Sequence, residues 1–588
     1  MKRCFSRLTL LAIAVSIIPL AASASVRYVK AGASGDGSSW ASATGNLQDA
    51  IEASQAGDEV WVAAGIYKPD SLIRSNKPTS RAFFLKDGVS LYGGFAGNEA
   101  TKEERQVGAA PYEMVNATIL DGDDDVPDVW VREIAAGTSF RLTWRVENDE
   151  VVGTSGNASH VLYSANVIST KTVIDGFTLK GGNANVWNVK ACGGALYAQG
   201  NVQMRACQVI ENSAYFKAQS TSDSNTYGGA IFLNGSGDAA IVDCYIARCY
   251  SHSSYGNGIG GAIFVQNARV ENCNFEDCVA DDAGGAIYNQ NGTVTGCHFV
   301  ACYGGSGGAI YNDGIATGNT VMSCRGLLGG GIFNWGTASY NIVANCYADA
   351  IEYGETMGGR GGGILNADGM VLGSVVYNNQ AFWGGGIYCL NGKVVNCTVQ
   401  NNSLRAECDT ANIGYQHHEL SDQLTFNTIG NPNATSANFV APTTFNGVAA
   451  TAADTTAIMA ASWQLAQGSQ FIDAGTLTAG VSEDTDIAGN NRIQGESIDV
   501  GAYEYSAQAG LLGDVNGDGK VTATDITALY NFLLLGDTTY LSTSDINGDG
   551  EVTSSDGHLG CFHIMAIFLF FIFGVLYGLQ DLSSLARN

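Results

Sequence analysis

A short glycine-rich phrase recurs eight times between Gly193 and Tyr388 and constrains the fold more than any other feature. It reads Gly-Gly-Ala or Gly-Gly-Gly, then Leu or Ile, then usually Tyr or Phe, and it begins at positions 193, 228, 260, 284, 307, 329, 361 and 384. The spacings are 35, 32, 24, 23, 22, 32 and 23 residues, a base period near 22 to 24 with three insertions of about ten. A fixed period of this length indicates a solenoid with one rung per repeat.

Two further positions in each repeat predict what kind of rung is stacked. An apolar column is β-branched or aromatic in all eight repeats, as expected for strands: Val209, Ile246, Phe275, Phe299, Val321, Val343, Val376 and Val399. A turn column three residues later alternates between Cys and Asn: Asn212, Cys249, Cys278, Cys302, Cys324, Cys346, Asn379 and Asn402. Identical turns stacked on one another explain this pattern, because the same inward position accepts either a small thiol or an amide that hydrogen-bonds to the amides above and below it.

These columns favour an all-β fold, a right-handed parallel β-helix, over the other solenoids. Ankyrin and tetratricopeptide arrays need 33 or 34 residues of helix-forming sequence per unit, which the 76 glycines of this chain oppose. The leucine spacing of leucine-rich repeats is absent. With strands about 4.8 Å apart, eight rungs predict a rod of roughly 40 Å, before any coils upstream of Gly193 are added.

The ends of the chain suggest export and a capped rod. Residues 1–24 combine Lys2 and Arg3 with an apolar run and a small-residue cleavage site, as in a bacterial secretory signal peptide, so we expect a secreted or cell-surface protein. Residues 25–180 are expected to form an N-terminal cap with a short helix and the first irregular coils, 181–405 the regular β-helix, and 406–505 irregular C-terminal coils and a cap. Residues 506–512 form a linker.

Fifteen cysteines in an exported chain would ordinarily suggest disulfides. Cysteines stacked on adjacent rungs stand about 4.8 Å apart with parallel Cβ directions, whereas a disulfide requires Cβ atoms near 3.8 Å. Mostly buried free thiols are therefore expected. The net charge of −27 and the absence of a basic cluster argue against nucleic acid as a partner.

Residues 513–556 contain two loops with calcium-ligand spacing, 31 residues apart. The ligand positions are Asp514, Asn516, Asp518, Lys520, Thr522 and Asp525 in the first loop, and Asp545, Asn547, Asp549, Glu551, Thr553 and Asp556 in the second. Alternating oxygen side chains around a tight glycine turn converge on a hard cation, while Lys520 and Glu551 would offer backbone carbonyls. Two calcium ions are expected, and the module has too small a core to fold without them.

Two family resemblances follow from these motifs. The opening Tyr28-Val29-Lys30, the glycine-pair repeats and the ending Ile498-Asp499-Val500-Gly501-Ala502-Tyr503-Glu504 resemble the bacterial choice-of-anchor Q family, and the repeats resemble those of polymorphic outer membrane proteins. The calcium loops, with Asp at position 12, resemble a type I dockerin. That resemblance implies a cohesin-type partner, contacted by Ala523, Thr524, Ser554 and Ser555.

The tail, residues 557–588, departs from the dockerin pattern. A helix should follow Asp556, but sixteen mostly apolar residues span 564–579 instead, just short of the usual membrane span of about 20. We favour a shifted or truncated dockerin end over a membrane anchor, so membrane contact is expected only if this tail is genuine. A genuine tail would compromise the second calcium loop.

Two functions remain open from the sequence. The first is a carbohydrate-binding or adhesive rod, in which aromatic residues beside the glycine pairs or at insertions stack on sugar rings: Trp187, Trp335, Trp383, Tyr227, Tyr255 and Tyr303.

The alternative is a polysaccharide lyase or glycoside hydrolase, which would need clustered carboxylates and a basic residue. Candidates on neighbouring rungs are Asp243, Glu271, Glu276, Asp277, Asp281 and Asp282, with Arg248, Arg269, Arg325 and Arg360. No spacing marks a catalytic pair, and His252, His298, His417 and His418 show no metal-binding pattern. Converging carboxylates would favour the enzyme, and scattered charges with exposed aromatics would favour the binder.

Overall fold

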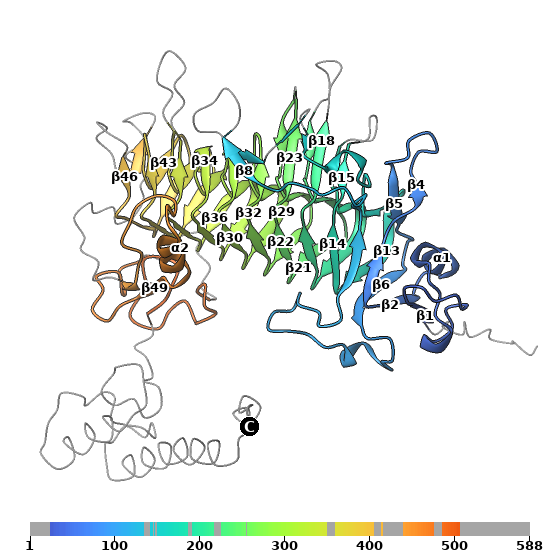
Figure 1. Cartoon of the computed structure of the whole chain (residues 1–588). Helices are drawn as coiled ribbons and strands as arrows, with labels where there is room; N and C mark the ends of the chain where they lie inside the picture. Colours follow the sequence, from blue (N-terminus) through green and yellow to red (C-terminus); the bar gives the residue numbers. More distant parts are fainter. Residues whose placement is uncertain are drawn as a thin grey trace, which may run out of the picture.

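The computed structural model describes residues 24–505, apart from residues 135–141, 145, 148–149, 186–190, 217–224, 255, 350–358, 405–412, 416–438 and 476–484. The described chain is a parallel β-helix whose rungs lie side by side along one axis (Figure 1). Each complete rung contributes strands to three long sheets, here numbered 1 to 3. This confirms the predicted parallel β-helix.

Sheet 1 is the widest wall, and most of its regular rungs contribute two strand segments separated by a bend. Its strands are β1 Val26–Val29, β2 Glu59–Ala63, β4 Ser71–Leu72, β5 Arg81–Phe84, β6 Ser90–Phe95, β12 Leu162–Tyr163, β13 Ile168–Asp175, β16 Leu196–Arg205, β20 Ile231–Gly235, β21 Ala240–Val242, β25 Ile263–Gln266, β26 Arg269–Glu271, β29 Ile287–Thr295, β32 Ile310–Thr317, β35 Ile332–Asn334, β36 Thr337–Ser339, β39 Ile364–Asn366, β40 Met370–Leu372, β43 Ile387–Cys389, β44 Lys393–Val395 and β47 Ile413–Tyr415.

Sheets 2 and 3 form the other two walls, and their strands are shorter. Sheet 2 runs β3 Gly65–Tyr67, β7 Thr118–Asp121, β14 Phe177–Lys180, β17 Gln208–Ile210, β22 Tyr245–Ala247, β27 Asn274–Glu276, β30 His298–Val300, β33 Thr320–Met322, β37 Ile342–Ala344, β41 Val375–Tyr377 and β45 Thr398–Gln400. Sheet 3 runs β15 Asn183–Ala184, β18 Ser213–Phe216, β23 Tyr250–Ser253, β28 Val279–Ala280, β31 Tyr303–Ser306, β34 Arg325–Leu328, β38 Tyr347–Ala348, β42 Gln380–Ala381 and β46 Ser403–Leu404.

The remaining elements lie outside the three walls. The helices are α1 Leu47–Ala53 and α2 Ala452–Met459, with 3-10 turns η1 Trp40–Ser42, η2 Lys102–Glu104 and η3 Thr154–Gly156. Two-stranded pairs are β8 Arg132–Ile134 with β9 Leu142–Trp144, β10 Val146–Glu147 with β11 Glu150–Val151, β19 Thr226–Tyr227 with β24 Gly258–Ile259, and β48 Phe439–Ala441 with β49 Ser462–Leu465. Neither helix has the length and apolar character of a membrane span, and this finding concerns the described residues.

The glycine pairs form the turn from sheet 3 into sheet 1, and backbone crowding explains them. The first glycine of every pair has φ between 57° and 74°, a region that side chains rarely adopt. A Cβ there would also lie 1.9 to 2.5 Å from the carbonyl oxygen three residues later. A Cβ on the second glycine would collide with the next rung; at Gly285, for example, it would lie 2.0 Å from the Gly308 carbonyl oxygen. The repeat phrase is therefore a packing requirement of the turn.

The apolar column forms the inner face of sheet 2. Its members, from Val209 to Val399, pair residue for residue along the sheet and are at most 1% exposed. Phe275 and Phe299 stack with ring centroids 4.7 Å apart. These side chains fill the interior of the solenoid with a continuous apolar column.

The turn column lies between sheets 2 and 3, and each member follows a residue with positive φ, from Glu211 to Asn401. Asn379 donates from Nδ2 to Oδ1 of Asn402 at 3.0 Å, and the stacked thiols donate to backbone carbonyls. All twelve cysteines of the described chain are buried and free, as predicted, and burial raises the pKa of the Cys397 thiol to about 12.

Segments outside the repeats lie against the solenoid. Helix α1 buries Leu47 and Ile51 against the N-terminal end of the core. Residues 439–475 and 485–505, for which we expected irregular coils and a cap, instead lie along the outer face of sheet 2 (Figure 1, orange). Phe439, Trp463 and Phe471 pack there because β37 and β41 present apolar residues outward, such as Tyr377.

Candidate functional site

The walls of the rod differ in what covers them. Tyr112, in the loop between β6 and β7, stacks on Tyr245 of sheet 2 with ring centroids 5.6 Å apart. Farther along, residues 439–475 and 485–505 cover the same sheet. At sheet 3, Trp130 and Val146 pack against a cluster that includes Tyr250 and Tyr303. Sheet 1 carries a row of outward aromatic residues, most of which stay partly exposed.

An aromatic column runs along the outer face of sheet 1. It consists of Tyr163, which follows the buried Leu162, and of the residues that follow the buried Leu or Ile in the first six glycine-pair phrases, in register from rung to rung: Tyr163, Tyr197, Phe232, Phe264, Tyr288, Tyr311 and Phe333. Neighbouring ring centroids are 4.5 to 5.5 Å apart, and from Tyr197 onward the rings are within 15° of parallel. Burial raises the pKa of Tyr197 and Tyr311, so these phenols stay protonated at neutral pH.

A second column lies two residues farther along the same strands. Its members are Gln199, Asn234, Gln266, Gln290 and Asp313, again in register. Their side chains are partly or fully exposed on the outer face. Gln199 donates from Nε2 to the Tyr197 hydroxyl at 2.7 Å. We call these five residues the amide column. Rings beside carboxamides and hydroxyls are a surface chemistry suited to sugars.

The aromatic residues proposed from sequence have different environments. Trp335 is 45% exposed at the bend between β35 and β36 of sheet 1, and Trp383 is 38% exposed just before the glycine pair that leads into β43. Tyr227 packs edge-on against Phe264 at 5.0 Å. Tyr303 was a wrong choice, because it is fully buried in a cluster on sheet 3 against which Trp130 packs. Trp187 and Tyr255 lie outside the described residues. Sequence reasoning missed the aromatic column, although its signal was the last residue of the repeated phrase.

The carboxylates considered for catalysis are dispersed over the rod. Asp243 and Asp277 occupy positive-φ turns, and Asp277 pairs with Arg132 at 2.8 Å. Glu271 lies on sheet 1 beside Arg269 at 3.3 Å, and Glu276 lies on sheet 2, where it accepts from the Tyr245 hydroxyl at 2.7 Å.

The remaining charged candidates also have partners near them. Asp281, with Asp282 after it, follows β28 at sheet 3 and contacts His252. Arg248 pairs with Glu211, Arg325 holds Asp349 through two hydrogen bonds of 2.7 Å, and the Arg360 guanidinium lies over the Tyr388 ring. His298 is on sheet 2, and His417 and His418 lie outside the described residues. Of all the candidates, Glu276, Asp277 and Arg248 are neighbours where sheet 2 turns into sheet 3, and the others are spread along the rod.

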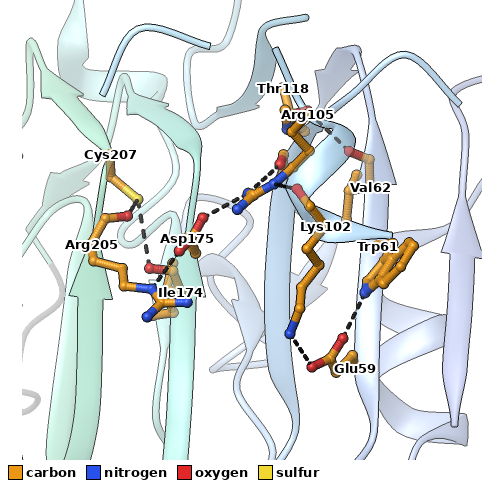
Figure 2. Close-up of polar contacts among 12 residues, drawn as sticks. Glu59, Trp61, Val62, Lys102, Arg105, Thr118, Ile174, Asp175, Arg205 and Cys207 are labelled. Atoms are coloured by element: carbon orange, nitrogen blue, oxygen red, sulfur yellow. Dashed lines mark hydrogen bonds and ion pairs between the residues drawn. The ribbon is translucent and has the colours of Figure 1, made fainter. Parts of the chain in front are cut away.

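The densest polar cluster of sheet 1, at its N-terminal end, is structural. Arg105 and Arg205 flank the Asp175 carboxylate, which is 5% exposed, and Arg105 also donates to the Gly93 carbonyl at 2.9 Å (Figure 2). Nearby, Glu59 joins Lys102 to the Trp61 indole N–H. These contacts fasten the loop after β6 onto the sheet.

Metal ligands are not gathered in the solenoid. No three His, Cys, Asp or Glu side chains come together as a metal site among the residues that the structure describes. The predicted calcium ligands and the partner-binding residues Ala523, Thr524, Ser554 and Ser555 belong to residues 506–588, outside the described residues. Their oxygen-rich donor set suits calcium.

Comparison with known proteins defines the class. Residues 175–348 match the family model described as right handed beta helix region, and residues 512–559 match the model described as Dockerin type I domain. The chain therefore carries a right-handed parallel β-helix and a type I dockerin domain.

Among the solved structures that are similar to the chain are a pectate lyase and a complex with xylose, and no curated protein matches it. Pectate lyase Pel9A is 13% identical, with 82% of this chain and 97% of that chain covered at a TM-score of 0.36. The complex of XylC with xylose is 11% identical, with 66% and 70% covered at a TM-score of 0.25. At these identities no activity can be transferred to the chain.

Proposed function

We propose that this protein is an extracellular or cell-surface carbohydrate-binding rod that a calcium-dependent dockerin domain attaches to a cohesin-type partner. The observation that carries the proposal is the outer face of sheet 1, where the aromatic column and the amide column run in register over consecutive rungs. A polysaccharide is itself a linear repeat, so a repeating surface can contact several of its units at once.

The dockerin match supports the attachment half of the proposal. Type I dockerin domains bind calcium, and both loops of this chain supply the required oxygen ligands. We infer two ions, one per loop, with Ala523, Thr524, Ser554 and Ser555 facing the cohesin. Residues 1–24 would direct export. The finer resemblance to the choice-of-anchor Q family stays a hypothesis.

The dispersed carboxylates favour binding over catalysis. A lyase or hydrolase needs an acid and a base within reach of one bond. Here Glu276 lies at the end of β27 on sheet 2, Asp277 in the turn directly after it and Asp281 at sheet 3, and each is held by a partner. Among the described residues, no acid and base converge in a way that supports the polysaccharide-degrading alternative.

The test uses the mature full chain on an array of neutral and acidic polysaccharides and, separately, on a panel of type I cohesins. We expect glycan binding that survives EDTA, and cohesin binding that EDTA abolishes and calcium restores. The double variant Asp518→Ala with Asp549→Ala should lose the cohesin and keep the glycan. Failure to retain any glycan would refute the binding half, and cohesin binding that persists in EDTA would refute the attachment half. Release of reducing ends or unsaturated products would establish the enzyme instead.

A further inference from the structure

The stacked rings of the aromatic column are not themselves sugar platforms. A sugar ring packs its C–H groups against the face of an aromatic ring. Between Tyr197 and Phe333 the rings are parallel within 15° and about one rung apart, so each ring covers the faces of its neighbours. What the column presents outward is therefore ring edges and phenol hydroxyls. A ligand on this wall needs an indole or phenol that stands apart from the stack.

Trp335 is such a residue, and it lies in line with the amide column. It directly follows β35, and its backbone N–H donates to the Asn312 carbonyl of the preceding rung at 2.8 Å. The next residue along in that preceding rung is Asp313, the last member of the amide column. The Trp335 ring is tilted 50° from Phe333 at a centroid distance of 6.1 Å, so it does not continue the stack. Its side chain is 45% exposed.

The line from Gln199 to Trp335 therefore offers two kinds of contact. Four carboxamides, each with donors and acceptors, occur once per rung, and an indole follows at the end. Six successive positions at about 4.8 Å per rung span roughly 24 Å along the axis of the rod. This length suits a segment of an extended polysaccharide, with hydroxyls on the amides and one ring on the indole.

The charge along this line indicates which polysaccharide. Its one charged member is the carboxylate of Asp313, and neither Lys nor Arg occurs among the six residues. A polyuronate would meet no cation there and would be repelled at Asp313. An uncharged chain meets hydrogen-bonding partners without that penalty.

We propose that the line Gln199, Asn234, Gln266, Gln290, Asp313 and Trp335 binds a neutral polysaccharide parallel to the axis of the rod, with Trp335 as the stacking platform. This inference rests on the proposed function and specifies its ligand class and site.

The test measures binding of xylan, mixed-linkage glucan, galactomannan and polygalacturonate by affinity electrophoresis, at low and high salt. We expect at least one neutral polysaccharide to bind with little dependence on salt. Trp335→Ala should weaken that binding about tenfold, and Gln290→Ala about fivefold. Trp335→Phe should restore part of it. Ile66→Ala is the control, because Ile66 is 58% exposed on β3 of sheet 2, away from this line, and it should change nothing.

The outcomes separate this inference from the proposed function. Neutral binding that Trp335→Ala leaves intact, or that Ile66→Ala reduces equally, overturns the site while the proposed function stands. Preferential, salt-sensitive binding of polygalacturonate overturns the ligand class alone. Wild-type protein that retains none of the four polysaccharides overturns both.

Discussion

At the scale of single residues, buried polar groups are as important to this rod as its apolar core. A ladder inside sheet 1 joins Asn289, Asn312, Asn334 and Asn366, each Nδ2 donating to the next Oδ1 at 2.8 Å. All four are 0% exposed, and each also donates to a carbonyl at the bend of its rung. The ladder thus satisfies polar groups that water cannot reach.

Breaking this ladder should be costly. Asn334→Leu removes a donor and an acceptor and leaves Asn312, Asn366 and the Gly336 carbonyl with lost partners. We expect the free energy of unfolding to fall by about 2 to 3 kcal/mol. Urea denaturation measures this, and the exposed Asn391→Ala is the control, expected to change stability by at most about 0.5 kcal/mol. Equal losses in the two variants would contradict a special role for the ladder.

His160 makes a second prediction at this scale, for pH. The ring is fully buried and its Nδ1 is 2.8 Å from the Gly193 carbonyl oxygen. Burial lowers its pKa to about 4, below the ordinary value of 6.5. The unfolded chain therefore takes up the proton first, and His160 destabilises the fold as pH falls from 6.5 to 4, with no effect above about 7.

The loss attributable to His160 should reach about 3 kcal/mol at pH 4. Other groups titrate in this range, so the measurement compares the pH dependence of unfolding in wild type and His160→Gln. The variant should lose less stability between pH 7 and 4. Parallel curves for the two proteins would show that His160 is not the responsible group.

At the scale of elements, one buried arginine fastens the segment 485–505 to the solenoid. Arg492 is 0% exposed, its guanidinium lies 4.7 Å from the centre of the Tyr340 ring, and it donates to the Gly501 carbonyl at 2.9 Å. Its Nη1 is 3.3 Å from the Glu504 carboxylate, which is also buried. The contact between this segment and the solenoid therefore contains the buried guanidinium of Arg492, with the Glu504 carboxyl beside it.

Arg492→Ala should loosen this segment, because it removes the guanidinium that contacts the Tyr340 ring and donates to the Gly501 carbonyl. Burial raises the pKa of Glu504 to about 8, so its carboxyl is largely neutral at pH 7 and the loss comes from packing and hydrogen bonding, about 2 to 4 kcal/mol. We expect faster amide exchange at 485–505 and in β37 and β41 beneath it, with β16 to β29 unchanged. Arg269→Ala, which removes a half-exposed ion pair, is the control. Unchanged exchange at β37 and β41 would refute the fastening role.

At the scale of the whole molecule, the stacked rungs make the thiols inaccessible together. The twelve described cysteines are each at most 3% exposed and are spread along the regular rungs from Cys192 to Cys397. Reaching one requires opening the solenoid, so local fluctuation should expose few of them.

We therefore expect iodoacetamide to leave all twelve unmodified in the native protein and to modify all twelve in guanidinium chloride. Peptide mapping by mass spectrometry identifies each site, and Cys408 and Cys561, outside the described residues, do not enter the comparison. Modification of Cys278 or Cys302 under native conditions would show that the stack opens far more readily than its burial implies.

The sequence by itself determined the β-helix, the residues of its interior columns and the type I dockerin domain. Each of these depends on a contact that recurs: a glycine that only a crowded turn requires, an apolar residue above another, an oxygen at fixed loop spacing. Tertiary structure alone decided which walls are covered, which carboxylates are paired and where Trp335 stands relative to the amides. The segments around Tyr112, Trp130 and Arg492 each pack at a single place on rungs that are distant in sequence. Because such a contact is not repeated from rung to rung, it produces no periodic pattern in the sequence.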